Sequence, residues 1–133
     1  DKSYQINCTY EVDEVILDRK LVEQVLSNLL VNAFKYTPSK GVISVKWKPF
    51  EQGHLLEVQD SGPGIAKKHH QRIFERFYRI DKSRSNEISG TGLGLAIVKH
   101  AAIRHGGRVW IESDKGEGAR FLVYFPGQEL AEV

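Results

Sequence analysis

Apolar and polar residues alternate one by one over the first part of the chain, between positions 4 and 18. This period of two is typical of a β-strand with one buried face. From residue 19 the period lengthens to three or four, which predicts a helix over 19–36 that Asp18 can cap. The apolar helix positions are Val22, Val25, Leu26, Leu29 and Ala33. The turn-forming sequence TPSKG over 37–41 is expected to end this helix.

The rest of the chain predicts four more strands and two more helices. The strands are expected over 43–48, 55–59, 108–113 and 119–125, and the helices over 67–77 and about 95–105. Ile73, Phe74 and Phe77 would form the apolar side of the first of these helices. Pro63 and two glycines interrupt the chain over 60–65, and the polar, charged stretch 79–90 predicts a mobile loop. This order predicts an α/β (α+β) two-layer sandwich with helices on one face of a mostly antiparallel sheet.

Composition narrows the class of protein. A length of 133 residues, with 41% hydrophobic and 27% charged residues, fits one globular domain over 1–133. The formal charge of +2 is too small to favour nucleic acid or an anionic membrane as the main partner. The single cysteine, Cys8, cannot form an internal disulfide, which favours a reducing compartment. Because the chain contains no Met, we expect it to be a piece of a longer protein.

The helix predicted over 19–36 carries a polar stripe. Its members Asn28, Asn32, Lys35 and Tyr36 lie at i, i+4, i+7 and i+8, on or near one helix face. Asparagine is a mediocre helix former, so two on one stripe need a reason. One reading is a solvated polar face. The other is a site in which an amide oxygen binds Mg²⁺ and the lysine faces phosphate.

Asp60 ends the strand expected over 55–59. Strand alternation places it on the same side as Leu56 and Val58, so its carboxylate should point toward the core, where it needs hydrogen-bond donors. An adenine amino group is one such donor. A turn-capping Asp before glycine is the alternative, and this motif alone does not decide between them.

Three glycines, Gly90, Gly92 and Gly94, lead directly into the last predicted helix. Such spacing lets backbone N–H groups reach phosphate oxygens at a helix N-terminus. It is not the Rossmann spacing, because residue 95 is Leu, and no Gly-Lys-Ser/Thr of a P-loop occurs. The five histidines lack zinc-site spacing. Trp47 and Trp110, each at a strand position, are expected in the core.

Together these segments resemble the ATP-binding catalytic domain of bacterial sensor histidine kinases, in the GHKL (Bergerat-fold) superfamily that also contains DNA gyrase B and MutL ATPases. Four family motifs occur in the family's order across nearly the whole chain. The N box is similar to NLLVNAFKYT over 28–37, the G1 box to DSGPGI over 60–65, the F box to IFERFYR over 73–79, and the G2 box to GTGLGL over 90–95. One small departure is Ala66, where many relatives have Pro.

The resemblance implies a mixed sheet packed against about three helices, and ATP and Mg²⁺ as cofactors. It implies that Tyr36 packs at the adenine and that Asp60 accepts a hydrogen bond from the adenine amino group, directly and through water. The residues expected to contact the nucleotide are Asn28, Asn32, Lys35, Tyr36, Asp60, Gly62, Gly64, Ile65, Phe77, Arg79, Gly90, Thr91, Gly92, Leu93, Gly94 and Leu95.

On the phosphate side, the resemblance implies that Asn32 coordinates Mg²⁺ and that Asn28 supports the phosphates. Lys35 would bind phosphate, and Arg79 would contact the γ-phosphate during transfer. We therefore expect Arg79, Asn28 and Lys35 to act in catalysis and residues 79–90 to form the ATP lid. Phosphoryl transfer depends mainly on positioning and charge stabilisation, which these groups can supply.

The resemblance also implies partners. The family's phosphoacceptor helix carries a His followed by an acidic residue and soon after by a Pro, and none of the five histidines has that context. We therefore expect the dimerisation and phosphoacceptor domain, and any sensor region, to lie outside this chain. A response regulator is expected downstream, with no nucleic acid and no direct membrane contact by this domain. The expected location is the cytoplasm, including the cytoplasmic part of a membrane-bound sensor.

Three alternatives stay open within the superfamily. A clamp-type ATPase would carry Glu at position 28 as a general base, whereas this chain has Asn28, which cannot act as one. A serine or anti-sigma-type kinase would lack the signature over 74–79. A nucleotide-sensing module without activity would carry damage in at least one of the four motifs.

Overall fold

The computed structural model describes residues 4–10, 19–80, 93–113 and 116–127. In chain order the elements are β1 (Tyr4–Tyr10), α1 (Arg19–Tyr36), β2 (Gly41–Phe50), β3 (Gly53–Asp60), the 3-10 helix η1 (Lys67–His69), α2 (Gly94–Arg104), β4 (Arg108–Ser113) and β5 (Ala119–Pro126). Every strand predicted within these segments is present, as are both long helices. No helix of the described segments is both long and apolar enough to cross a membrane.

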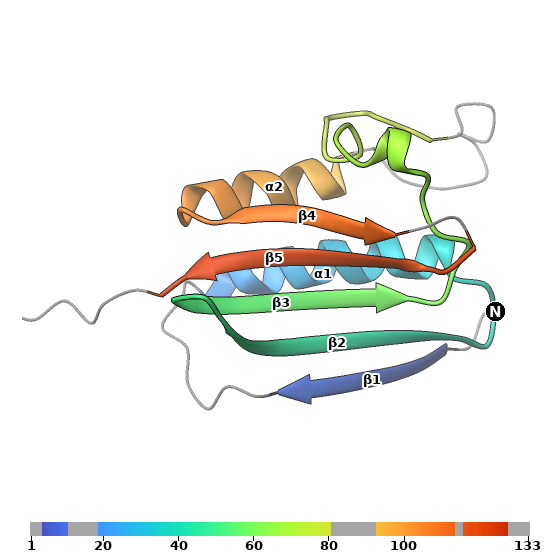
Figure 1. Cartoon of the computed structure of the whole chain (residues 1–133), viewed down its shortest axis with the longest axis horizontal. Coiled ribbons are helices and arrows are strands. Elements are labelled where there is room, and N and C mark those ends of the chain that lie inside the picture. The colour runs from blue at the N-terminus through green and yellow to red at the C-terminus, as the bar shows by residue number, and fades with distance from the viewer. Residues whose placement is uncertain (1–3, 11–18, 81–92, 114–115, 128–133) are drawn as a thin grey trace, which may run out of the picture.

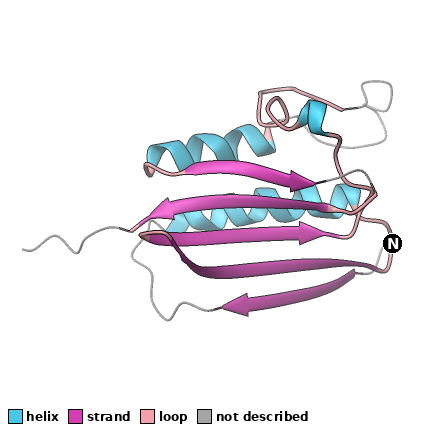
Figure 2. Ribbon diagram, viewed as in Figure 1, coloured by secondary structure: helices cyan, strands magenta, loops and turns pink. Residues whose placement is uncertain are grey.

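The strands form one five-stranded sheet in the order β1-β2-β3-β5-β4. β1 runs parallel to β2, and all other neighbouring strands are antiparallel. Helices α1 and α2 lie on the same face of the sheet (Figures 1 and 2). The predicted two-layer sandwich with a mixed, mostly antiparallel sheet is therefore confirmed. Helix α1 connects the two parallel strands, as a crossover connection requires.

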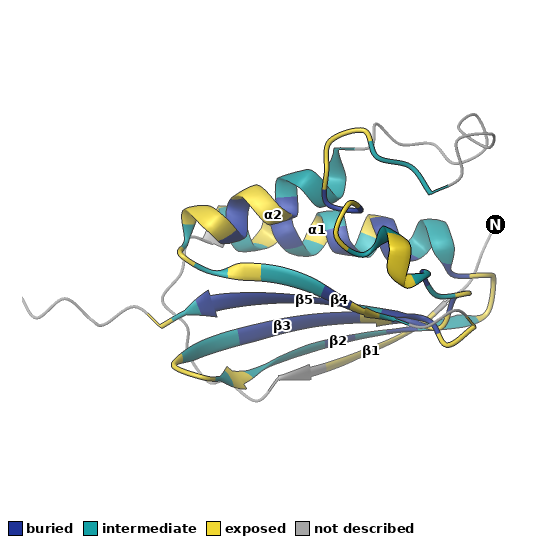
Figure 3. Cartoon of the chain, turned by 45° about the horizontal axis from the view of Figure 1, so that its top comes forward, coloured by how far each residue is buried: buried dark blue, intermediate teal, exposed yellow. Residues whose placement is uncertain are grey.

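The main core lies between the two helices and the sheet. Val25 and Leu29 of α1 and Val98 of α2 have no exposed surface, and they face Phe121 and Phe125 of β5 across this layer. Figure 3 shows the buried residues concentrated where helices and sheet meet. Burial of each such side chain contributes about 1.5–3 kcal/mol, so the apolar stripe of α1 holds its polar stripe at a fixed place.

The other face of the sheet carries a second, smaller apolar cluster. It consists of Leu55, Leu122 and Tyr124, with Phe50 and Trp110 packed against them. Trp47 packs against the main core, as expected. Trp110 does not, because the alternation of β4 turns it to the face that carries no helix. Trp110 therefore packs against the smaller cluster rather than the main core.

The helix predicted over 67–77 is also corrected. Only η1 is helical, and the chain continues through turns closed mainly by hydrogen bonds between residues three apart, such as Arg72 N–H to the His69 carbonyl. Ile73 and Phe74 are buried as predicted, but Phe77 is 66% exposed and has a φ of 64°. A left-handed residue reverses the chain direction, so Phe77 leaves the apolar side that it would share with its neighbours in a helix.

Candidate functional site

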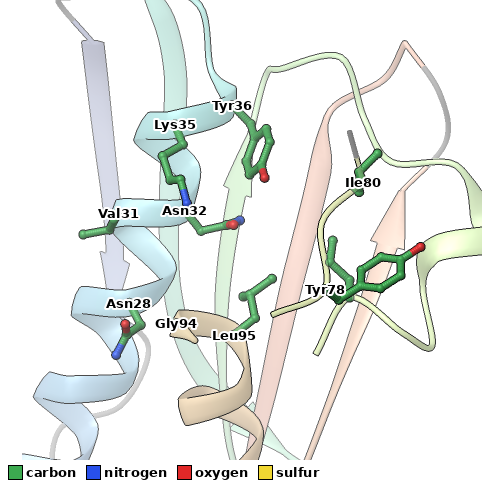
Figure 4. A pocket seen from close by; sticks show the side chains of 10 residues that line it. Asn28, Val31, Asn32, Lys35, Tyr36, Tyr78, Ile80, Gly94 and Leu95 are labelled. Atoms are coloured by element: carbon green, nitrogen blue, oxygen red, sulfur yellow. The ribbon is translucent and has the colours of Figure 1, made fainter. Parts of the chain in front are cut away.

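A pocket opens between the C-terminal half of α1, the first turn of α2 and the segment that follows Phe74 (Figure 4). The polar stripe of α1 forms one wall, and apolar side chains form much of the other. Its lining residues are Asn28, Val31, Asn32, Lys35, Tyr36, Ile73, Tyr78, Ile80, Gly94 and Leu95. The solvated-face reading of the polar stripe therefore gives way to the reading in which the stripe borders a cleft.

Asn28 links α1 to the beginning of α2. Its Nδ2 donates to the Gln24 carbonyl at 2.8 Å, so the amide is held against its own helix. A Cβ at Gly94 would lie 3.1 Å from the Asn28 Oδ1, closer than most such contacts. The glycine thus lets the N-terminus of α2 approach Asn28 closely. The positive end of the α2 dipole and its free N–H groups favour an anion in this corner.

Asn32 is the most informative side chain of the wall. It is only 9% exposed, and its Nδ2 has no hydrogen-bond partner among the described residues. A buried donor left in this state costs about 1–3 kcal/mol, which a ligand oxygen would recover. The amide oxygen of the same group is a suitable Mg²⁺ ligand. The residue therefore fits both a phosphate oxygen and the metal that would accompany it.

Two cations lie close together at the C-terminal end of the polar stripe. Burial lowers the pKa of Lys35, and the neighbouring Arg79 guanidinium lowers this pKa further. Burial raises the pKa of Tyr36, and Arg79 partly opposes that rise. No Asp or Glu occurs among the described residues that line the pocket. A lysine in a pocket wall without described carboxylates, with a second cation nearby, favours the binding of an anion.

Asp60 lies at the end of β3 and is 5% exposed. Its Oδ1 accepts the backbone N–H of Gly62 at 2.9 Å, as the turn-capping reading expects. Burial raises the pKa of Asp60, and hydrogen bonds from the backbone of Gly62 and Ala119 oppose the rise. A Cβ at Gly62 would lie 2.5 Å from the Tyr36 carbonyl oxygen, so the turn after Asp60 packs directly on the last residue of the pocket wall.

The other residues expected at the site divide into four groups. Gly94 and Leu95 line the pocket, whereas Gly90, Thr91 and Gly92 lie outside the described residues. Gly64 has a φ of 80°, which suits glycine, and Ile65 belongs to the main core rather than to the pocket. Phe77 and Leu93 line a different groove, on the outer side of α2, and their contact with the nucleotide stays a prediction.

Four lining residues were not anticipated: Val31, Ile73, Tyr78 and Ile80. Val31 lies three positions after Asn28 and four before Lys35, so helix periodicity could have placed it on the same face. Ile73 was expected only as a core residue. Tyr78 and Ile80 follow the left-handed Phe77, and no pattern in the sequence predicts that reversal.

Comparison with known proteins agrees with this geometry. Residues 17–129 match the family described as histidine kinase-, DNA gyrase B-, and HSP90-like ATPase. The chain therefore belongs to this family of ATPases. More particularly, it is an ATP-binding catalytic domain of the sensor histidine kinase type, as the following relatives indicate.

The chain is 50% identical over 112 residues to the phosphate regulon sensor protein PhoR of Pseudomonas aeruginosa, which covers 84% of this chain and 25% of that protein. It is 41% identical over 120 residues to the sensor histidine kinase WalK of Bacillus subtilis, and this alignment covers 89% of this chain and 20% of WalK. The chain thus spans a quarter or less of these two relatives.

Solved structures give the same result. The mycobacterial sensor histidine kinase MprB superposes with a TM-score of 0.81 at 30% identity, over 96% of this chain and 84% of that one. Full-length ShkA, solved in complex with AMPPNP, superposes with a TM-score of 0.83 at 30% identity, over 96% of this chain and 26% of that one. The fold of this chain is therefore the fold of these sensor histidine kinase structures.

Proposed function

We propose that the chain binds Mg²⁺-ATP and transfers the γ-phosphoryl group to a histidine on a separate dimerisation and phosphoacceptor domain of a two-component sensor kinase. The observation that carries the proposal is the electrostatic design of the pocket. A buried amide donor at Asn32, the Lys35 ammonium and the first residues of α2 line one pocket, and Arg79 lies close enough to lower the pKa of Lys35. ShkA, which has a similar fold, was solved with AMPPNP, an analogue of ATP.

The roles of the residues follow from their positions. Asn32 would hold Mg²⁺ through Oδ1, and this metal, when bound, would neutralise charge on the phosphates. Lys35 would bind a phosphate oxygen, with Asn28 supporting it at the start of α2. Arg79 would stabilise the charge on the γ-phosphoryl oxygens as the bond to the leaving group breaks. Asp60 would accept a hydrogen bond from the adenine amino group.

Slow hydrolysis is part of the proposal. A rapid ATPase needs a carboxylate or similar base to activate water, and Asn28 occupies the place at which a clamp ATPase would carry Glu. The amide instead donates to its own helix at the Gln24 carbonyl. The phosphoryl group would therefore pass to an imidazole nitrogen brought by the acceptor domain rather than to water.

A groove on the outer side of α2 would receive the acceptor domain. Phe77 and Ile103 both line it, and they are 66% and 58% exposed. The cations Arg76, Lys99 and Arg104 line the same groove. An amphipathic helix with an apolar face and acidic flanks fits this combination. Phe77 would thus serve the partner, while Tyr78, on the opposite side of the chain, lines the nucleotide pocket.

The test is radiolabelled ATP with the chain alone and with a separate protein that carries the acceptor domain. We expect no label on the chain alone, very slow phosphate release, and label on the acceptor histidine when both proteins are present. An Arg79→Ala variant should lose transfer far more than ATP binding, because its contact matters most in the transition state. Rapid phosphate release by the chain alone would instead support the ATPase alternative.

A further inference from the structure

Tyr78 lines the nucleotide pocket, but its hydroxyl contacts a residue outside that pocket. Its hydroxyl lies 2.5 Å from the Nδ1 of His69, and the two rings are 5.8 Å apart. The guanidinium of Arg72 lies 4.9 Å from the centre of the Tyr78 ring. Figure 4 shows the Tyr78 hydroxyl pointing away from Asn32 and Leu95. One side of the residue thus belongs to the pocket, and its polar tip belongs to a contact outside it.

His69 is itself fixed to the body of the domain. It ends η1, and its carbonyl accepts the backbone N–H groups of Arg72 at 3.1 Å and Ile73 at 2.8 Å. The adjacent His70 contacts the Ile65 carbonyl through Nε2 at 2.8 Å, and the Ile65 N–H donates to the Ser113 hydroxyl at 2.8 Å. His69 is therefore connected to the sheet through short contacts.

The segment that needs this support begins at Phe77. Its φ of 64° is in the left-handed region, which a bulky residue adopts only when its neighbours hold it there. Tyr78 is the next residue, and its backbone N–H donates to the Glu75 carbonyl at 3.2 Å. Arg79 follows directly, at the point where it lowers the pKa of Lys35. Because Arg79 is the next residue along the chain, a firmly held Tyr78 restricts where the Arg79 backbone lies.

We propose that His69 is a positioning residue for phosphoryl transfer: through its hydrogen bond to the Tyr78 hydroxyl it fixes the wall of the nucleotide pocket and the place from which Arg79 approaches Lys35. This inference rests on the proposed function. Partial burial and the nearby Lys68 and His70 lower the pKa of His69, which favours a neutral ring whose Nδ1 accepts the Tyr78 O–H. His69 touches no reacting atom in this arrangement and acts only through Tyr78.

The variants separate the hydrogen bond from the ring. Tyr78→Phe removes the hydroxyl and keeps the ring in the pocket wall, and His69→Ala removes the acceptor. His69→Asn keeps a hydrogen-bonding atom near the position of Nδ1 and should restore function. Gln71→Ala, at an exposed neighbour on the same segment, is the matched control. Thermal unfolding of every variant shows whether the fold itself is affected.

The readout is phosphoryl transfer to the acceptor domain, with kcat and KM for ATP measured separately, together with calorimetric binding of ADP. Tyr78→Phe and His69→Ala should each lower kcat about 3- to 10-fold, as expected for one lost hydrogen bond. The double variant should lose no more than either single variant. ADP affinity should change less than twofold, because ADP lacks the γ-phosphate that Arg79 would contact. His69→Asn and Gln71→Ala should transfer at nearly the wild-type rate.

The possible outcomes distinguish failure of this inference from failure of the proposed function. A wild-type chain that binds neither ATP nor ADP overturns the proposed function and the inference with it. Normal wild-type transfer with an undiminished kcat in Tyr78→Phe overturns the inference alone. Equal losses of ADP binding and of transfer, or additive losses in the double variant, also overturn it, because they would indicate a general loosening of the pocket. A change in the nitrogen NMR signals of the His69 ring in Tyr78→Phe supports the contact without any nucleotide.

Discussion

Cations occupy two very different settings in this domain. On the outer face of the sheet they lie beside carboxylates: Lys48 is 3.5 Å from Glu57, and Arg120 is 3.2 Å from Glu112. In the pocket, Lys35 is partly buried, and its neighbouring charge is a second cation, Arg79. The first arrangement is complete in the protein as it stands. In the second, no Asp or Glu occurs among the described residues that line the pocket, so an entering anion would gain a favourable interaction with Lys35.

The largest effect is expected when the positive charge of Lys35 is removed from the pocket. Lys35→Met keeps the length of the side chain and removes its charge. ATP affinity should fall about 10-fold or more, because a charge-assisted hydrogen bond of ~1.5–3 kcal/mol is lost. The free energy of unfolding should not fall, since a repulsion with Arg79 disappears as well. Calorimetry with ATP and thermal unfolding measure the two effects, and a variant that binds ATP as the wild type does would contradict the proposed role.

A substitution at Asp60 tests the proposed adenine contact. Asp60→Asn preserves the shape of the side chain but removes its charge and half of its acceptor capacity. We expect ATP and ADP affinity to fall equally, by about 1.5–3 kcal/mol, because both nucleotides carry the same amino group. Titration with both nucleotides is the measurement. An unchanged affinity at an unchanged fold would leave Asp60 with the turn-capping role alone.

The pH dependence of stability and of nucleotide affinity provides a second test of the role of Asp60. Burial raises its pKa in the folded chain above the unfolded value, so its contribution to stability is fully present below the unfolded pKa and is lost as the pH rises through the folded pKa. Nucleotide affinity should have the opposite trend, because protonation removes an acceptor. As the pH is lowered from about 7 to about 4, nucleotide affinity should fall, while the contribution of Asp60 to the free energy of unfolding should rise. The Asp60→Asn variant should lack both trends.

The smallest effect is expected on the outer face. Lys48→Met removes one member of an ion pair whose side chains are 31% and 10% exposed. The free energy of unfolding should fall by less than ~1 kcal/mol, and ATP affinity should stay at the wild-type value. The same substitution at Lys35 should do the reverse. Equal effects of the two variants on ATP binding would mean that the pocket cation acts only through the overall charge.

Periodicity predicted the long elements well because burial enforces it. The limits of α1 agree with the predicted range 19–36, and its polar stripe borders the pocket because Val25 and Leu29 fix the rotation of the helix. The alternation of β3 likewise predicted that Asp60 points toward the helices, where it is buried. In these cases one hydrophobic face leaves a single placement for the polar residues beside it.

Features that depend on contacts between distant residues could not be predicted. The segment after η1 has an apolar pattern that fits a helix, but the left-handed Phe77 ends that pattern and sends Tyr78 into the pocket. Trp110 has the alternation of a core residue, yet alternation does not reveal which face of a strand the helices cover. The roles of the residues expected to contact the nucleotide rest on the resemblance, and the variants above are needed to establish them.

The order of the strands has a consequence for how the domain assembles. One half of the chain, from β1 to β3, is built from neighbours in sequence, and so is the other half, from α2 to β5. The halves meet where β3 pairs with β5, with Asp60 opposite Ala119, and where Gly94 approaches Asn28. The pocket lies on this junction, so a bound nucleotide would act as a clamp between two locally formed halves. Two separate peptides divided between β3 and α2 should therefore associate more tightly when ATP is present.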